Sequence, residues 1–268
     1  MMKAHKLFKS FLLIVLVLLA GCGKEPEPAP PPAKGKVLFK FHHYCEGMPI
    51  EYDTRKYINQ AGNEYMVNEI QYFISDVYLN RTGSDYMIHA WKDIHYIDSD
   101  IETSQEWAVF DNITTGYYTG ISFTFGITEE KNITLMYTDP PESLMFWPKY
   151  LGGGYHYMKL NGKWLDPSGL ERPYNFHLGI GQIYDPDSGD ITGFIQNYFE
   201  IVVPASSFEI YPGETTTIDF VMHVDRWFKN PHMYDHNVWG GDIMQNQDAM
   251  QVGCENGHNV FEVLSVGF

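Results

Sequence analysis

Histidine is the residue type in this chain with the clearest capacity for chemistry. The sequence holds eleven histidines, and only His5 precedes residue 42. Imidazole is the commonest nitrogen ligand for copper and zinc, so a chain this rich in histidine invites a metal interpretation. Any one histidine is more often a hydrogen-bonded core or surface residue than a ligand. A metal site is therefore supported only where several histidines act as a group.

The spacing of these histidines matches no closed zinc motif. His232 and His236 have the i, i+4 spacing of a helical metal pair, although Pro231 and Asp235 fit a loop equally well. No Glu follows His232 as a zinc peptidase requires. No Gly-x-Ser-x-Gly elbow or ordered Ser, His and Asp set occurs either, so the sequence predicts a binding protein and not an enzyme.

The N-terminal residues indicate where the protein works. Lys3, Lys6 and Lys9 precede an apolar run over residues 11–20, which is too short for a membrane span but suits a signal peptide. The run ends in a lipobox-like segment before Cys22, which predicts a lipoprotein signal peptide over 1–21 and lipidation of Cys22. An ordinary secretory signal with a chance cysteine is the alternative.

A proline-rich stretch over residues 22–36 follows the predicted lipidation site. Proline fixes φ and removes donors, so this segment predicts an extended tether that places the domain roughly 30 Å from the membrane. Position 23 is Gly and not Asp, so inner-membrane retention is not signalled. We expect a cell-envelope protein at the outer membrane, on its periplasmic or surface face, with the membrane as a partner through Cys22.

The composition of the remaining chain predicts its fold class. The formal net charge of −16 argues against nucleic acid and against direct binding to anionic lipid. Aromatic residues make up 16% of the chain, with 19 Tyr and frequent Gly and Pro, which is typical of all-β proteins. We expect residues 37–268 to form one antiparallel β-sandwich with long loops and one or two short helices.

Period-two alternation locates the expected strands. Predicted strands cover residues 37–42, 71–79, 120–126, 154–160, 175–178, 197–203 and 216–224. Asn161 and Gly162 form the strongest hairpin-turn signal, expected between the strands over 154–160 and 175–178. The likeliest short helices cover residues 225–230 and 242–254.

Two cysteines remain besides Cys22. In an oxidising compartment, Cys45 and Cys254 suggest a disulfide that joins the first strand to the last segment. By the chain-entropy estimate, so long a loop gives roughly 5 kcal/mol of stabilisation. The alternative is two free or metal-binding thiols.

Several segments resemble the MbnP-like copper-binding family, which is named for a protein encoded with methanobactin genes. VNEIQYFISDVYL over 67–79 resembles a YISNVxL strand, and GYYTGISFTFG over 116–126 resembles its G-x-Y-x-x-I-x-F-x-x-G segment. The resemblance continues with MFWP at 145–148, GGYHYMKL at 153–160, FHLG at 176–179 and NGHNVF at 256–261. Two departures are the lack of a second tryptophan after Trp147, where Tyr150 stands, and the lack of a cysteine shortly after FHLG.

The resemblance implies a copper site of two histidines and, in relatives, a tryptophan oxidised to kynurenine. His89 and Trp91 fit the family's His-x-Trp pattern, with His95 nearby, and on a regular strand all three share a face. His177 in the FHLG motif and His42 complete the predicted ligand set. An ordinary cross-strand His/Trp pair would also explain the first two residues. A dihaem cytochrome peroxidase is the implied partner.

The sequence therefore predicts a lipid-anchored copper binder in copper acquisition or storage. The alternative is a surface lipoprotein that binds carbohydrate or another small ligand on an aromatic platform. Such a platform would draw on the tryptophans, although most large aromatic residues belong to cores. The six tryptophans are Trp91, Trp107, Trp147, Trp164, Trp227 and Trp239.

Overall fold

Alternation of buried and exposed side chains is clearest in the first strand, β1 (Lys34–Cys45), where every second residue from Gly35 on is buried. The computed structural model describes residues 30–83, 86–87 and 93–268. It begins β1 at Lys34, three residues inside the stretch that the sequence assigns to the tether. The residues from Pro32 to Phe268 form one compact unit.

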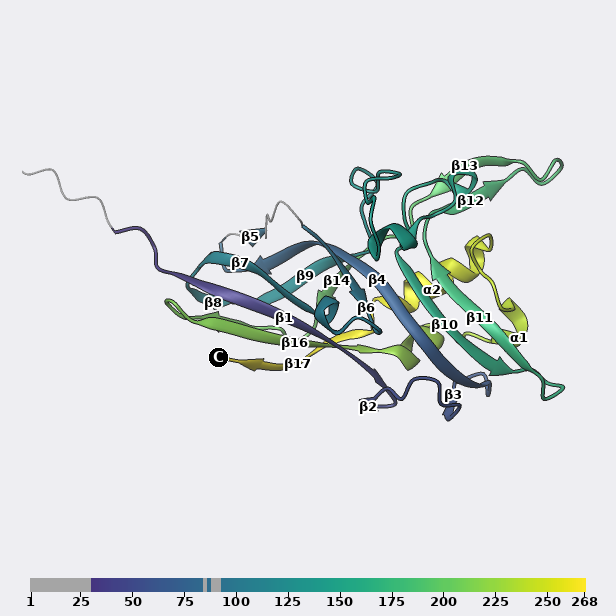
Figure 1. Cartoon of the computed structure of the whole chain (residues 1–268), viewed down its shortest axis with the longest axis horizontal. Coiled ribbons are helices and arrows are strands. Elements are labelled where there is room, and N and C mark those ends of the chain that lie inside the picture. Colours follow the sequence, from purple (N-terminus) through teal and green to yellow (C-terminus); the bar gives the residue numbers. More distant parts are fainter. Residues whose placement is uncertain (1–29, 84–85, 88–92) are drawn as a thin grey trace, which may run out of the picture. The chain divides into compact units, whose positions relative to one another are not determined.

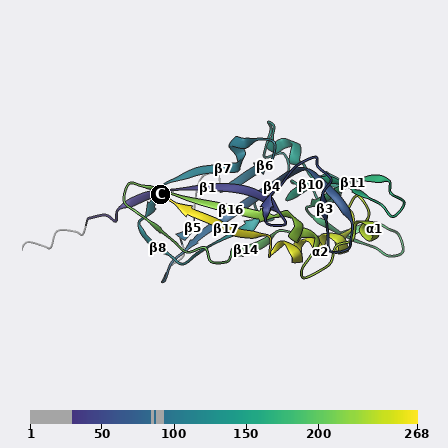
Figure 2. The same cartoon turned by 90° about the horizontal axis from the view of Figure 1, so that it is seen from below.

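One sheet has β1 near its centre. Its strand order is β17-β16-β1-β2, and β7 also pairs with β1 (Figures 1 and 2). β1 and β16 run parallel, with Lys36 opposite Thr215, whereas the other pairings of this sheet are antiparallel. The partners of β1 are β2 (Met48–Pro49), β7 (Glu106–Thr114), β16 (Thr215–His223) and, through β16, β17 (Phe261–Gly267).

The second sheet is built around the 17-residue strand β4 (Glu64–Asn80). Its order is β11-β10-β4-β9-β14, and β3, β5 and β6 also pair with β4. These strands are β3 (Tyr57–Ile58), β5 (Tyr86–Met87), β6 (Ile94–Asp98), β9 (Gly120–Phe125), β10 (Met158–Leu165), β11 (Glu171–Leu178) and β14 (Phe199–Val203). Two small ribbons pair β12 (Gly181–Tyr184) with β13 (Ile191–Ile195) and β8 (Gly116–Tyr118) with β15 (Phe208–Ile210).

Helices are few and short. The 3-10 helices are η1 (Glu102–Gln105), η2 (Glu142–Met145), η3 (Lys149–Leu151) and η4 (Val224–Phe228), and the α-helices are α1 (His236–Trp239) and α2 (Gln247–Gly257). Both expected helical segments are present, as η4 and α2. The side chain of Asn246 caps α2 by accepting from the backbone N–H of Ala249. Among the described residues, no helix has the length and apolar content to cross a membrane.

Aromatic side chains hold the two sheets together. Phe123 of β9 meets Phe220 of β16 edge-on, with ring centroids 6.0 Å apart, and meets Phe261 of β17 at 5.2 Å. Tyr72 of β4 lies 6.0 Å from the same Phe261 and stacks on Phe125 at 5.7 Å. Such pairs contribute about 0.5–1.5 kcal/mol each beyond the area they bury. The predicted all-β sandwich is confirmed, with the parallel β1–β16 pair as the departure from a purely antiparallel arrangement.

The predicted turn at Asn161 and Gly162 is wrong. β10 runs straight through both residues, and the chain reverses after it, where the backbone N–H of Asp166 donates to Leu170. A Cβ at Gly162 would lie 2.4 Å from the Tyr174 ring and 2.1 Å from the Met66 carbonyl. The glycine is therefore required by close packing across the sheet and not by a turn.

Of the two arrangements left open for His232 and His236, the structure has the loop, since His232 lies before α1 and contacts Glu255. His236 is fully buried, and neither of its ring nitrogens has a hydrogen-bond partner. It is enclosed by aromatic rings, with Tyr174 stacked at 4.5 Å and Tyr234 edge-on at 5.2 Å. Burial lowers the pKa of His236 to about 3.

We expect this buried histidine to make the domain acid-sensitive. Its pKa is lower in the folded than in the unfolded chain, so the unfolded state takes up the proton first as pH falls below about 6.5. Because of His236, the free energy of unfolding should fall by about 1.4 kcal/mol for each pH unit between about pH 6.5 and about pH 4. His236→Phe keeps a ring in the cage and removes this dependence.

Urea unfolding of wild type and His236→Phe between pH 7.5 and 4.5 measures the effect. The stability difference between them should shift in favour of the variant as pH falls. Tyr234→Phe alters the same cage without a group that titrates in this range, so its offset from wild type should stay constant. Parallel pH curves for wild type and His236→Phe would contradict the prediction.

Candidate metal centre

The predicted ligands do not form one group in the structure. His89 and Trp91 lie outside the described residues. His42 on β1 bonds to Asp219 at 2.8 Å, and His95 on β6 stacks on Trp107, with centroids 4.7 Å apart. His177 on β11 is a neighbour of neither His42 nor His95. Of the predicted set, His42, His95 and His177 therefore do not converge on one site, and the part that rests on His89 and Trp91 lies outside the described residues.

His177 instead lies against His156, a residue that the sequence did not single out as a ligand. Their ring centroids are 5.1 Å apart and the ring planes are nearly perpendicular, at 85°. His156 stands just before β10, which pairs with β11 so that Met158 lies opposite Leu178. This pairing brings together two histidines that are 21 positions apart in the chain. The neighbouring strands β10 and β11 are visible in Figure 1.

The tautomer of His156 follows from its backbone contact. Its Nδ1 lies 2.9 Å from the carbonyl oxygen of Met145. A carbonyl oxygen only accepts, so Nδ1 carries the hydrogen and Nε2 carries the lone pair. That Nε2 is buried and has no hydrogen-bond partner.

The tautomer of His177 follows from a chain of two side-chain hydrogen bonds. The Asn161 Nδ2 donates to the Glu69 carboxylate at 3.1 Å, which turns the amide oxygen of Asn161 toward His177. His177 Nε2 then donates to that oxygen at 2.7 Å. The lone pair of His177 therefore lies on Nδ1, which is buried and has no partner. Ligand histidines commonly donate their other N–H to such an acceptor, which orients the ring.

Burial keeps both imidazoles neutral. It lowers the pKa of His156 to about 3, with a further lowering by the nearby Lys159 ammonium. Burial also lowers the pKa of His177 well below its usual value, assisted by His156 and Lys159. Leaving a buried acceptor unpaired costs about 1–3 kcal/mol. Two neighbouring lone pairs in this condition form a donor set ready for a cation that prefers nitrogen ligands.

Trp147 forms one wall of this site. Its ring meets His156 edge-on at 4.6 Å, and its Nε1 donates to the Leu151 carbonyl at 3.0 Å. On its other side the ring packs on Gly179, where a Cβ would lie 2.6 Å from ring atoms. This contact explains the glycine that follows His177 and Leu178.

The number of ligands restricts which metal the site suits. Within the described ranges, the acidic group of Glu69, Asp98 and Asp100 is the one set of three or more His, Cys, Asp or Glu ligand atoms within 4.8 Å of one another. Its oxygens suit hard cations, and Asp98 already accepts from Gln71 at 2.9 Å. The histidine pair therefore supplies two nitrogen ligands without a third side chain of these types.

The predicted disulfide is wrong, because Cys45 and Cys254 are free thiols in the structure. The Cys45 Sγ lies 3.4 Å from the Tyr65 hydroxyl, and the Cys254 Sγ donates to the Asn197 carbonyl at 3.3 Å. Burial raises the pKa of each thiol to about 12. Both therefore remain protonated at neutral pH and are poor metal ligands.

The tryptophans do not form an exposed platform in the part of the chain that the structure describes. Trp107, Trp147, Trp164 and Trp227 are buried, and Trp239 is half-buried. These five tryptophans therefore offer no exposed platform for a carbohydrate, whereas Trp91 lies outside the described residues.

Comparisons with known proteins identify the family of the chain. The family model described as MbnP matches residues 34–247. Among solved structures, MbnP from Methylosinus trichosporium matches with 15% sequence identity and a TM-score of 0.49, covering 75% of this chain and 79% of that chain. No curated protein matches the sequence.

The assigned tautomers can be tested by nitrogen-15 NMR. We expect His156 to carry its hydrogen on Nδ1 and His177 on Nε2 throughout pH 5 to 8, because neither ring takes up a second proton there. Asn161→Leu removes the acceptor, so His177 should populate both tautomers while His156 is unchanged. A titration of either ring near pH 6.5 would contradict the assignment.

Proposed function

Because the chain belongs to the MbnP family, we propose that it binds copper through His156 and His177, as a lipid-anchored protein of the cell envelope. The observation that carries the proposal is the pair of adjacent imidazoles, each with its lone pair buried and unpartnered. The proposed role is copper acquisition or storage, since a buried two-nitrogen site suits holding a metal.

The donor set favours Cu(I) over zinc. Zinc in proteins takes four ligands at structural sites and three at catalytic ones. His156 and His177 provide two, and the described residues add no third His, Cys, Asp or Glu to them. Cu(I) is satisfied by two neutral imidazoles. Both rings are already neutral, so binding requires no proton release.

Trp147 replaces Trp91 in our proposal as the tryptophan of the site. The resemblance implies an oxidised tryptophan next to the copper ligands in relatives, and among the described tryptophans Trp147 is the one whose ring lies against His156. If it is oxidised to kynurenine, its new amine would be beside the imidazole pair. Intact-mass analysis of the native protein distinguishes the two forms. A dihaem cytochrome peroxidase remains the proposed partner for that oxidation.

The copper proposal is tested by replacing each histidine with phenylalanine, which keeps a flat ring and removes the nitrogens. His156→Phe and His177→Phe should each weaken Cu(I) binding by more than about 100-fold, since even residues that only orient a ligand cost 10- to 100-fold. Competition with a chelator of known affinity under reducing conditions gives the constants.

His95→Phe is the matched control. This residue is a half-buried histidine with one hydrogen bond to a backbone carbonyl, that of Ser104, and it is among the ligands predicted from the sequence. Its replacement should leave copper affinity unchanged. Equal affinity in wild type and both pair variants, with native circular dichroism, would refute the site.

The anchor is proposed from sequence and tested separately, since Cys22 lies outside the described residues. Cys22→Ala should leave the signal peptide uncleaved or release the protein from membranes, because the lipid attachment atom is gone. Membrane fractionation and mass spectrometry of the mature protein measure both. Normal processing with unchanged membrane association would show that Cys22 is not lipidated.

A further inference from the structure

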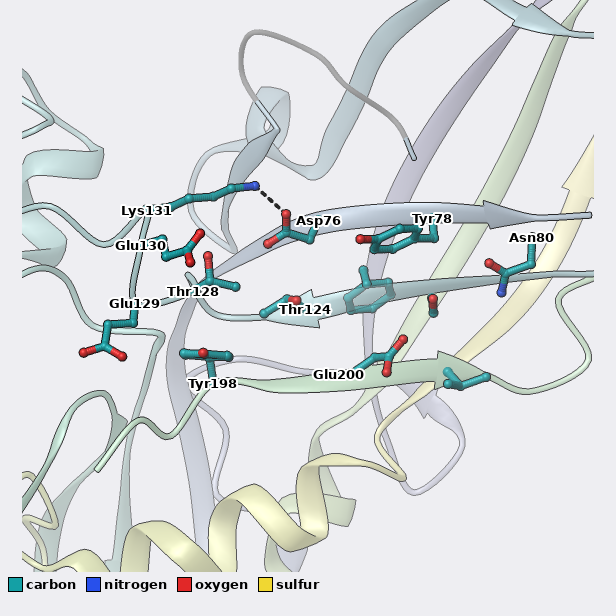
Figure 3. A pocket seen from close by; sticks show the side chains of 13 residues that line it. Asp76, Tyr78, Asn80, Thr124, Thr128, Glu129, Glu130, Lys131, Tyr198 and Glu200 are labelled. Carbon is teal, nitrogen blue, oxygen red and sulfur yellow. Dashed lines mark hydrogen bonds and ion pairs between the residues drawn. The ribbon is translucent and has the colours of Figure 1, made fainter. Parts of the chain in front are cut away.

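A groove of about 880 Å³ lies on the face of β4, β9 and β14 that is turned away from the core. Alternation explains the surface: Ile121, Phe123 and Phe125 of β9 are buried, whereas Thr124 points outward. Figure 3 shows Tyr78 on β4, Thr124 on β9 and Glu200 on β14, and the register places Glu200 opposite Thr124. The histidine pair is not among its lining residues.

A β-bulge shapes one end of the groove. The register between β4 and β9 shifts between Ser75 and Tyr78, and Asp76 has a φ of 49°. A non-glycine residue in the left-handed region is uncommon, and bulges re-aim side chains at functional sites. Here the Asp76 carboxylate is directed at the Lys131 ammonium, which also pairs with Asp93 (Figure 3).

The groove is strongly acidic. Its lining includes four carboxylates and one ammonium, that of Lys131, which is already paired. Glu129, Glu130 and Glu200 are exposed, and their side chains have no ion pair or hydrogen bond with any described residue. The free charge of the groove is therefore negative and available to a ligand.

Two tyrosines add surfaces suited to organic cations. Tyr78 and Tyr198 are half-buried lining residues, and neither hydroxyl has a hydrogen-bond partner in the described ranges. The face of an aromatic ring attracts ammonium and guanidinium groups within about 6 Å of its centre. Carboxylates and tyrosine rings together match the chemistry of lysine and arginine side chains.

We propose that this groove binds an extended, lysine- and arginine-rich peptide segment of a partner protein. A single metal ion does not fit it, because no three of the groove's carboxylates bring their oxygens within 4.8 Å of one another. A thin polyamine would leave most of its volume empty. The groove is open and crosses to β14, whose strand pairing is with β9 alone among the described strands, so an extended chain has room to lie there.

The test uses the soluble mature domain and fluorescein-labelled hexalysine as the probe, measured by fluorescence anisotropy. Glu129→Gln together with Glu200→Gln removes two groove carboxylates and keeps their shape. We expect this double variant to weaken binding about 3- to 30-fold, the range of two partly exposed ion pairs. Rising salt should weaken wild-type binding as well.

Glu102→Gln together with Glu214→Gln is the matched control, because it removes the same charge from exposed sites outside the groove. This control should change affinity less than about twofold. Equal weakening by both double variants would overturn the proposal, since the effect would then belong to the net charge. So would absent binding of hexalysine at low salt, or spermine binding as tightly as hexalysine, which would identify a small polyamine site.

Discussion

The single N–H of each imidazole in the candidate metal centre is placed on an acceptor, and these two contacts determine the geometry of that centre. The Met145 carbonyl takes the hydrogen of His156, and the Asn161 amide oxygen takes that of His177. Each contact leaves the opposite nitrogen as a buried lone pair. The pairing of β10 with β11 then places the two rings next to each other, with their centroids 5.1 Å apart. The acceptors matter as much as the histidines, since they orient the lone pairs.

Strand β4 connects this centre with the rest of the fold. Near its start, Glu69 holds the amide that orients His177. In its middle, Tyr72 packs in the aromatic core between the sheets. Toward its end, the bulge at Asp76 forms part of the acidic groove. One long strand thus contributes to the candidate metal centre, to the core and to the acidic groove.

Local pattern predicted the sheets well and the site only in part. Alternation in residues such as Phe39 and Phe41 identified β1, because period two is a property of the strand itself. The turn predicted at Gly162 was wrong, because the need for glycine comes from the Tyr174 ring on the next strand and not from residues adjacent in the sequence. The FHLG motif singled out His177 as a candidate ligand. His156 was not singled out, although it lies among aromatic residues in the GGYHYMKL segment. The disulfide failed for a related reason: spacing along the chain does not tell whether two thiols meet in space.

The parallel pairing of β1 with β16 has a consequence for the order in which the protein is made. Lys36 lies opposite Thr215, so β1 cannot pair with β16 until that later strand has been synthesised. β17, at the very C-terminus, must then add to β16 before that sheet is complete. Contacts so distant along the chain form slowly. The sheet that contains β1 is therefore completed last, after the strands of the β4 sheet have all been synthesised.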